Sequence, residues 1–400
     1  FIKYFLCLIY SSKIIADKKK KVIFIASYFK NLDLNIIQKK LHQLPFLYLF
    51  DPKPKKKRCN ESLRKSIRIQ NGSNEFEKLL VFLIPKQIPI AYVENFQSYN
   101  RLSKFLFPSK PSVIFTANSY YFNECFKVWV ANKMEQGAKL FIAQHGGFGT
   151  ALWNQTEEHQ IKICDRFFSW GWERANEKKI KAMPANKLND IKKKISSKKN
   201  GKILCIVNSD IINYLHTQVP HPTNSNFKKY ASNIIKLNDN LDVKVSSLMS
   251  YRLYHTDYNR DTYGLKTEFI KNGLSQSLDT NKHFYDSLNL SRIVIITYHP
   301  NATALETLSA NFPTLLFWDP RVFEINEYAN KYFLALKDAK VFHTSSESLK
   351  KHLEKVYLDI DRWWFSEEVQ NAVNQFCNEF ALSSDDFLES WANEISLSIN

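Results

Sequence analysis

The sequence predicts an α/β protein with parallel sheets, arranged as two domains. Short apolar runs rich in β-branched and aromatic residues alternate with stretches of helical spacing, which is typical of βαβ units. The chain has 400 residues, and one hydrophobic core seldom serves so many, so two domains are expected. The alternation of strand and helix occurs in both halves, and we therefore expect a parallel sheet in each half.

The first half contains several candidate strands that share a short, apolar, β-branched or aromatic character: residues 21–27, 44–50, 111–118, 139–143 and 165–172. Residues 75–83 and 119–136 have helical spacing, and residues 89–95 are expected to be extended. The sequence Thr156-Glu-Glu-His159 has the form of a capping box, with Thr156 as the N-cap of a further helix.

The second half repeats the alternation. Its candidate strands share the same character and lie at residues 201–209, 243–248, 292–297 and 313–318. Helical spacing occurs at residues 227–235 and from residue 345 to the end. Between strand 292–297 and the next strand, a loop leads into a helix that carries Glu306 about one turn inside.

A lysine-rich stretch is expected to mark the domain boundary. Residues 176–202 carry ten Lys against two acidic residues, together with Pro184 and Gly201. The predicted organisation is an N-terminal domain, a basic linker, a second domain and a set of C-terminal helices, at residues 1–190, 191–202, 203–365 and 366–400. The chain begins with Phe1 rather than Met, so its first domain is expected to be truncated.

The charge balance favours anionic partners. Lys and Arg number 56 and Asp and Glu number 39, so 56 − 39 gives a formal net charge of +17. Such a surface suits nucleic acid, an acidic membrane surface or phosphorylated small molecules, and a solvated lysine-rich surface without a partner is an equal alternative. The six Cys are scattered and lie mostly in apolar runs, which indicates a reducing compartment rather than a disulfide or zinc framework.

The first candidate site follows the strand at residues 139–143. Gln144 and His145 come directly after this strand, and three of the nine glycines in the chain follow at Gly146, Gly147 and Gly149. Ligands of parallel α/β sheets bind at the carboxyl ends of the strands, and glycines let a backbone approach a ligand closely. A histidine there can act as a general base. A buried His satisfied by the backbone is the alternative.

Acidic residues shortly after this turn are candidates for a second acid–base group. Glu158 is the catalytic candidate among Glu157, Glu158 and His159. The alternative is that these are ordinary residues of the first turn of a helix, where acidic side chains are favoured by the helix dipole.

The second candidate site follows the strand at residues 292–297. Thr297, His299 and Thr303 lie between this strand and a helix N-terminus, where backbone N–H groups and the helix dipole attract anions. Thr303 can bind a phosphate or act as a plain helix cap, and Glu306 can accept hydrogen bonds from a ribose.

The third candidate is Arg252, in an aromatic-rich loop with Tyr251, Tyr254 and His255. Arginine suits bidentate phosphate contact and aromatic rings suit stacking on a base, although a solvated aromatic loop is a close alternative. The sequence has no Walker A motif, no G-x-G-x-x-G and no G-x-S-x-G. Asp359-Ile-Asp361 lies in the helical tail, and no metal site is predicted.

Several ordered motifs resemble the leptospiral-type transferase family, which is associated with surface carbohydrate biosynthesis. They are Gln144-His-Gly-Gly147, Glu157-Glu-His159, Asp165-Arg-Phe-Phe-Ser-Trp-Gly171, Leu305-Glu-Thr-Leu308, Asn311-Phe-Pro-Thr314 and Phe317-Trp318. The resemblance covers residues 80–395. It implies a GT-B-like glycosyltransferase: two Rossmann-like domains with parallel sheets facing a cleft, the acceptor on the first, the nucleotide donor on the second, and C-terminal helices crossing back.

The resemblance also implies roles for individual residues. The turn at Gln144, His145 and Gly146 is similar to the His-Gly motif of polyol-phosphate polymerases, in which the His is the base, so His145 would deprotonate an acceptor hydroxyl. Thr303 and Glu306 look like donor-side positions. His299-Pro300 and His221-Pro222 are similar to the His-Pro pairs of CMP-sugar-dependent transferases, although their placement differs.

We therefore expect a metal-independent glycosyltransferase that moves a sugar from a nucleotide-sugar donor to a cell-surface polysaccharide or lipid-linked glycan. No cofactor beyond the nucleotide sugar is expected. The expected location is the cytoplasm, peripherally on the inner face of the cell membrane, with an anionic membrane surface as a partner and no nucleic acid. The alternatives are a polyol-phosphate transferase, a nucleotide-sugar epimerase of the same fold, or a basic nucleic-acid-binding protein.

Overall fold

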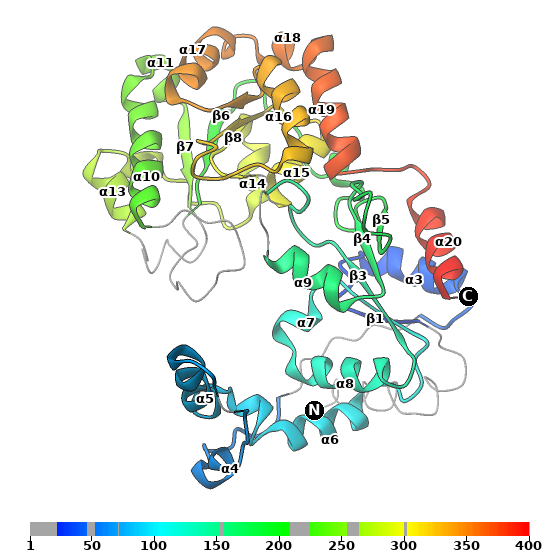
Figure 1. Cartoon of the computed structure of the whole chain (residues 1–400). Coiled ribbons are helices and arrows are strands. Elements are labelled where there is room, and N and C mark those ends of the chain that lie inside the picture. Colours follow the sequence, from blue (N-terminus) through cyan, green and yellow to red (C-terminus); the bar gives the residue numbers. More distant parts are fainter. Residues whose placement is uncertain are drawn as a thin grey trace. The chain divides into compact units, whose positions relative to one another are not determined.

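A computed structural model describes residues 22–45, 53–70, 72–151, 155–208, 224–253, 264–299 and 302–399 (Figure 1). By their mutual contacts these residues fall into two units, one within 1–143 and 392–400 and the other within 144–391. None of the helices in the described ranges combines the length and apolar character of a membrane-spanning segment. The predicted domain boundaries stay a prediction.

The first sheet has five strands in the order β1-β2-β3-β4-β5. Its strands are β1 (Val22–Ile25), β2 (Val113–Thr116), β3 (Lys139–Ala143), β4 (Arg166–Ser169) and β5 (Ile180–Ala182). β1 pairs with β2, β2 with β3, and β4 with β5, all in parallel. All residues of β1 and β2 are buried, as expected for strands covered on both faces.

The helices of this half lie between these strands in the chain. They are α3 (Asn31–Lys40), α4 (Glu61–Lys65), α5 (Glu75–Gln87), α6 (Phe96–Leu106), α7 (Ser119–Phe122), α8 (Glu124–Met134) and α9 (Gln155–Ile163). The helical spacing at 75–83 and 119–136 is thereby confirmed. The predicted strand 44–50 lies largely outside the described residues.

Two local predictions for this half are wrong. Residues 89–95 are not extended, because Tyr92 N–H bonds to Pro89 O and Asn95 N–H to Ile90 O, which closes a 3-10 turn, η1 (Ile90–Tyr92). Thr156 is not an N-cap, because α9 already begins at Gln155.

The second sheet also has five strands, in the order β10-β9-β8-β6-β7, and every adjacent pair is parallel. Its strands are β6 (Lys202–Ile206), β7 (Met249–Arg252), β8 (Ser291–Ile296), β9 (Thr314–Phe317) and β10 (Phe342–His343). The prediction of an α/β chain with a parallel sheet in each half is confirmed.

Helices flank the second sheet, with α10 and α13 toward one side and α16 and α19 toward the other (Figure 1). The helices of this half are α10 (Asn224–Asn240), α11 (Val243–Ser246), α13 (Leu265–Lys271), α14 (Phe284–Asn289), α15 (Ala302–Ser309), α16 (Glu327–Asp338), α17 (Ser346–Val356), α18 (Ile360–Trp364), α19 (Glu367–Phe380) and α20 (Phe387–Ile399). The helical C-terminal region and the helix carrying Glu306 are as predicted.

The predicted strand 243–248 is wrong. The side chain of Asp242 accepts a hydrogen bond from Lys244 N–H at 2.8 Å and starts the short helix α11, and the strand β7 begins only at Met249. The apolar alternation of Val243 and Val245 suits a strand, but an N-capping aspartate favours a helical turn.

The lysine-rich stretch 176–202 is more ordered than its composition suggests. It contributes β5 to the first sheet. Apolar residues recur between its lysines and are buried, among them Met183, Leu188, Ile191 and Ile195. The lysines therefore cover the outer side of a packed segment, because their long side chains keep the charge in water.

Trp391 connects the start of α20 to the rest of the unit within 144–391. Its side chain is fully buried, and its indole N–H donates to Pro184 O at 3.0 Å. Its ring meets Phe168 of β4 edge to face, with the ring centres 5.1 Å apart. The rest of α20, from Ala392, belongs to the other unit, where Lys139 Nζ donates to Ser398 O at 3.1 Å.

Replacing this side chain tests its contribution to packing. Trp391→Ala should lower the free energy of unfolding by about 3–5 kcal/mol, because it leaves a large cavity and removes the ring contact. Leu358→Ala is the control, since Leu358 is 76% exposed, and it should change the free energy by less than about 0.5 kcal/mol. Urea unfolding followed by tryptophan-independent circular dichroism measures both, and equal midpoints would contradict this role of Trp391.

Candidate active site

The candidate site is built on a loop that follows β3, residues 144–150, which we call the glycine loop. Its residues differ in exposure: His145, Gly146 and Gly147 are partly exposed, whereas Gln144 and residues 148–150 are buried. The loop therefore presents its histidine and two glycines to solvent at the carboxyl end of a parallel strand, which is where ligands bind in such sheets.

Gln144 fixes the start of the glycine loop. Its side chain is fully buried, and its Oε1 accepts hydrogen bonds from Trp170 N–H at 2.9 Å and from the indole N–H of Trp172 at 2.8 Å. Its Nε2 donates to Gly146 O at 2.6 Å. The amide thus ties the loop to the segment after β4, and a direct contact between Gln144 and a substrate stays a prediction.

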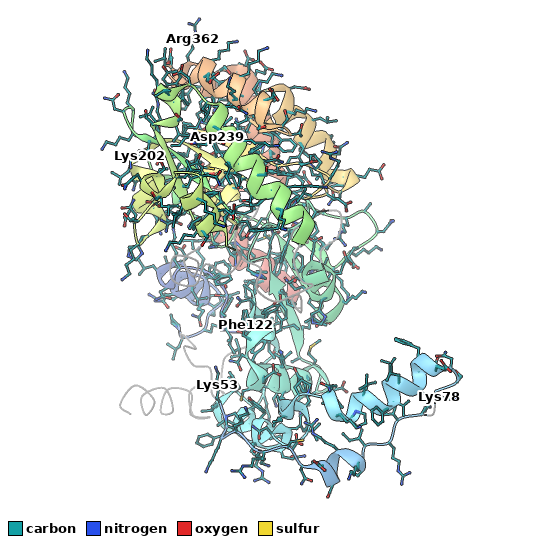
Figure 2. The ribbon with its side chains drawn as sticks, turned by 90° about the vertical axis from the view of Figure 1, so that its left-hand side faces the viewer. Lys53, Lys78, Phe122, Lys202, Asp239 and Arg362 are labelled. Atoms are coloured by element: carbon teal, nitrogen blue, oxygen red, sulfur yellow. The ribbon has the colours of Figure 1, made fainter. Side chains whose placement is uncertain are left out.

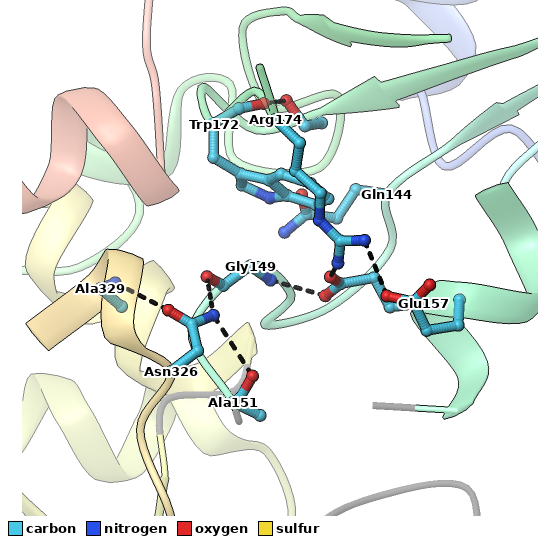
Figure 3. Close-up of polar contacts among 10 residues, drawn as sticks. Gln144, Gly149, Ala151, Glu157, Trp172, Arg174, Asn326 and Ala329 are labelled. Carbon is cyan, nitrogen blue, oxygen red and sulfur yellow. Dashed lines mark hydrogen bonds and ion pairs between the residues drawn. The ribbon is translucent and has the colours of Figure 1, made fainter. Parts of the chain in front are cut away.

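A carboxylate–guanidinium cluster supports the middle of the loop (Figure 3). Gly149 N–H donates to Glu157 Oε2 at 2.7 Å, and Arg174 pairs with Glu157 and, at 2.7 Å, with Glu158. The Arg174 guanidinium lies 5.5 Å from the ring centre of Trp172. Burial raises the pKa of the Glu157 carboxyl, while Gly149 N–H and Arg174 act in the opposite direction.

The predicted catalytic residue Glu158 lies in this cluster. Its partly exposed carboxylate already holds the guanidinium of Arg174. This arrangement is sufficient to give Glu158 a role in the support of the loop, and its role as an acid–base group stays a prediction.

Asn326 holds the far end of the loop (Figure 3). Its Nδ2 donates to Gly149 O at 2.8 Å and to Ala151 O at 3.2 Å, and its backbone N–H donates to Thr150 O at 3.0 Å. Its Oδ1 accepts from Ala329 N–H at 2.7 Å and so caps α16. The glycine loop is therefore attached to a helix that packs in the half of the chain carrying the second sheet.

His145 has an apolar neighbour on the same loop. Its ring meets Phe148 edge to face, with ring centres 5.2 Å apart and an interplanar angle of 86°. A partly exposed imidazole on a backbone that is fixed on both sides is suited to proton transfer, because its position does not depend on a ligand.

The residues predicted after β8 divide into buried and partly exposed ones. Thr297 is buried in a chain of hydrogen bonds: Asn208 N–H donates to Tyr230 OH at 2.7 Å, Tyr230 OH lies 2.6 Å from Thr297 Oγ1, and Thr297 donates to Ile206 O at 2.8 Å. Burial raises the pKa of Tyr230, so its hydroxyl stays protonated. Thr297 therefore ties β8 to β6, and its contact with a donor stays a prediction.

His299 and Thr303 also differ in their exposure to solvent. His299 is buried against Trp318 and Phe333, at ring-centre distances of 6.0 and 6.4 Å. Thr303 is partly exposed in the first turn of α15. Of the two, Thr303 is the one that the structure leaves accessible near a helix N-terminus. The second predicted His-Pro pair, at 221–222, lies outside the described residues.

Glu306 is buried on α15 and has two polar partners. Lys187 Nζ lies 3.2 Å from its Oε1, and Tyr285 OH donates to its Oε2 at 3.4 Å. Burial, with the charge of Glu306, raises the pKa of Tyr285 to about 12. The carboxylate keeps further lone pairs, so an additional hydrogen bond from a ribose hydroxyl is chemically compatible with these contacts.

Arg252 lies at the end of β7 in a polar cluster of its own. Its Nη1 is 2.6 Å from Asp279 Oδ2 and donates to Ser287 Oγ at 3.0 Å and to Asn281 O at 2.9 Å. Its charge is thus already compensated, so phosphate binding, which stays a prediction, would compete with Asp279. Its predicted companions Tyr254 and His255 lie outside the described residues.

The structure brings the predicted residues into three groups: the glycine loop with Glu158, the end of β8 with α15, and the end of β7. The supporting residues Trp172, Arg174, Lys187 and Asn326 were not foreseen from the sequence. Only Trp172 carried a signal, as part of the Ser-Trp-Gly-Trp run. Within the described ranges no three His, Cys or acidic side chains are placed to hold a metal ion.

Two parallel sheets, with polar loops at the carboxyl ends of their strands, define a ligand-binding α/β protein. Residues 2–395 match the model of the LIC12162 family transferases, and the chain belongs to this family, so it is a transferase. No curated protein matches the sequence.

Solved structures with some similarity are, by their titles, two trehalose-phosphate synthases and one glycosyltransferase. The trehalose-6-phosphate synthase OtsA is 10% identical over 76% of each chain, with a TM-score of 0.41. The UDP-forming α,α-trehalose-phosphate synthase from Burkholderia vietnamiensis is 10% identical over 76% of each chain, with a TM-score of 0.44. WaaG, a glycosyltransferase of lipopolysaccharide biosynthesis, is 13% identical over 94% of this chain and 99% of its own, with a TM-score of 0.35.

The glycine loop offers a matched pair of substitutions. Gly149 has φ of +82°, and an added Cβ would lie 2.7 Å from Trp172 Cδ1, whereas an added Cβ at Gly146 meets nothing within 4 Å. Gly149→Ala should therefore destabilise the protein by about 1–3 kcal/mol. Gly146→Ala should change the free energy of unfolding by less than about 0.5 kcal/mol. Thermal and urea unfolding check both, and equal effects of the two variants would contradict the described packing of the loop.

Proposed function

We propose that this transferase is a glycosyltransferase of GT-B-like architecture. It would move a sugar from a nucleotide-sugar donor to an acceptor used in making cell-surface polysaccharide or a lipid-linked glycan. The observation that carries the assignment is the glycine loop, which holds His145 partly exposed at the end of β3, while hydrogen bonds fix Gln144, Gly146 and Gly149 of the same loop. Family membership supports the transfer of a group, and the sequence resemblance supports a sugar as that group.

His145 would be the general base. The acceptor hydroxyl would give its proton to the imidazole as its oxygen forms a bond to the anomeric carbon. The bond from that carbon to the nucleotide phosphate would break, and the phosphate would leave with the electron pair. A histidine suits this step because its ordinary pKa lies near neutrality. Gln144 would act as a positioning residue, since its Nε2 holds Gly146 O next to the histidine.

The donor nucleotide would bind at the carboxyl end of β8. Thr303, in the first turn of α15, is placed to contact a phosphate, because helix N-termini present free N–H groups and a positive dipole end. Glu306 would accept a hydrogen bond from the ribose while Lys187 balances its charge. The sugar nucleotide would be a co-substrate, without a metal or other cofactor. We place the enzyme in the cytoplasm, peripherally on the inner face of the cell membrane.

Removing the imidazole tests the base. His145→Ala should lower kcat by about 10²–10⁴-fold, the usual contribution of a general base, while donor affinity stays unchanged. Turnover of the nucleotide sugar gives kcat, and isothermal titration gives the affinity. His283→Ala is the control, because His283 is an exposed histidine on another loop. Equal turnover of the His145 variant and the wild type would exclude this residue as the base.

A nucleotide screen tests the donor site. At least one of CMP, CDP, UDP and GDP should raise the melting temperature, because a ligand at 100 times its Kd stabilises the folded state by about 2.7 kcal/mol. Thr303→Ala should reduce this increase when it is measured against the same variant without nucleotide. A rise with none of the four would argue against a nucleotide-sugar transferase. Salt-sensitive binding of nucleic acid without dependence on His145 would favour the alternative of a nucleic-acid-binding protein.

A further inference from the structure

Helix α5 is rich in apolar residues that are exposed or partly exposed. It has 13 residues, none of them is buried, and its sequence contains the continuous apolar run 79–85. The exposed fractions are 68% for Phe76, 50% for Leu79 and 58% for Phe82. A helix that is hydrophobic all round is normally buried in a core or a membrane. Figure 2 shows the side chains of this helix around the labelled Lys78, with α4 beside it.

The exposure of α5 does not come from a loosely held segment. Arg64 of α4 forms a two-point ion pair with Glu94, with Nε–Oε1 and Nη2–Oε2 distances of 2.7 and 2.9 Å. The same guanidinium donates to the backbone carbonyls of Pro85 and Lys86, both at 3.1 Å. The hydrogen bond from Arg64 lowers the pKa of Glu94 to about 2, so the pair stays ionised.

This arrangement matters because it fixes both helices. The arginine of α4 caps the last carbonyls of α5 and is anchored to Glu94, which lies between η1 and α6. Asn60, the N-cap of α4, also donates its backbone N–H to Glu94 Oε1 at 2.8 Å. A buried ion pair of this geometry therefore holds an apolar helix in a defined position in solvent.

The segment that contains α4 and α5 is strongly basic. Residues 53–87 contain three acidic residues, Glu61, Glu75 and Glu77, and ten basic ones: Lys53, Lys55, Lys56, Lys57, Arg58, Arg64, Lys65, Arg68, Lys78 and Lys86. The difference, 10 − 3, gives a net charge of +7. All ten except Arg64 are exposed. Lys86 Nζ lies 3.2 Å from the ring centre of Phe82, so charge and apolar surface are in contact.

The exposed apolar side chains of α5 and the positive charge of residues 53–87 together favour an anionic lipid surface as the partner. Exposed aromatic and aliphatic side chains on a helix, in a segment of the chain rich in Lys and Arg, are typical of elements that lie in the interface of an anionic bilayer. A second copy of this chain would bring the same positive charge and would be repelled, so charge complementarity favours an acidic lipid surface.

We propose that α5 and the basic segment 53–58 form a docking surface for an anionic lipid bilayer. The apolar side chains of α5 would enter the boundary between headgroups and acyl chains, and the exposed lysines would contact the acidic headgroups. This inference rests on the proposed function, in that it names the surface by which a transferase for a membrane-bound acceptor would reach its substrate.

Sedimentation with vesicles tests the docking surface. The full chain should bind vesicles of phosphatidylcholine with phosphatidylglycerol, bind vesicles of phosphatidylcholine alone much more weakly, and lose binding as salt rises. The double variant Leu79→Asp/Phe82→Asp should lose about tenfold or more in affinity, because it places charges in the apolar face. Leu358→Asp/Phe365→Asp, at residues 76% and 57% exposed, is the matched control and should bind as the wild type does.

The contribution of the lysines in the basic segment 53–58 can be tested in the same way, with a matched control. Lys55→Glu/Lys56→Glu/Lys57→Glu should abolish the preference for the acidic vesicles, whereas Lys337→Glu/Lys351→Glu/Lys355→Glu, on exposed lysines of the other unit, should keep it. Circular dichroism confirms that each variant is folded. Absence of vesicle binding, equal binding to both vesicle types, or concentration-dependent self-association lost in the α5 variant would each overturn the proposal.

The outcome is separate from that of the proposed reaction. Vesicle binding is measured without a nucleotide sugar, and turnover is measured without vesicles. Binding without turnover would contradict the reaction only, and turnover of a water-soluble acceptor without binding would contradict the docking surface only.

Discussion

The buried amide of Gln144 is the contact on which the candidate site depends. One oxygen accepts from the backbone of Trp170 and from the indole of Trp172, and the nitrogen of the same amide holds Gly146 O. An apolar residue there would leave a buried indole N–H without its acceptor, which costs about 1–3 kcal/mol. A carboxylate would lose the donor to Gly146. A glutamine at this position satisfies both requirements, and so the loop that carries His145 has its shape before any ligand arrives.

A second set of contacts couples this loop to the half of the chain that carries the second sheet. Asn326 caps α16 through its oxygen and holds Gly149 and Ala151 through its nitrogen, so a shift of α16 would move the glycine loop. Lys187 and Glu306 make a similar connection between the segment after β5 and α15. Asn326 and Lys187 therefore each join two elements that lie apart in the chain.

The sequence predicts the strands of the two sheets better than it predicts the residues that support the glycine loop. Continuous apolar runs reveal β3, β6 and β8, because strands covered on both faces need apolar residues throughout. The strand β5 was not predicted, because lysines whose charged ends reach water surround it in the sequence. The predicted strand 243–248 begins instead with a helical turn, because the side chain of Asp242 caps it. The polar residues after β3 were recognisable, but Arg174 and Asn326 were not, because no local spacing records a hydrogen bond to a residue far along the chain.

Exposure separates the predicted site residues into two kinds that a sequence cannot distinguish. Gln144 and Thr297 are buried polar residues that directly follow their strands, and their hydrogen bonds go to neighbouring strands and loops. His145, in the loop after β3, and Thr303, in the first turn of α15, are partly exposed. In a parallel sheet, polar residues at the carboxyl ends of the strands can hydrogen-bond to neighbouring strands and loops or contact a ligand. The direction of each side chain decides which of these two roles it can have. The buried residues therefore hold the loops at these strand ends, and the partly exposed residues are the ones that a ligand can reach.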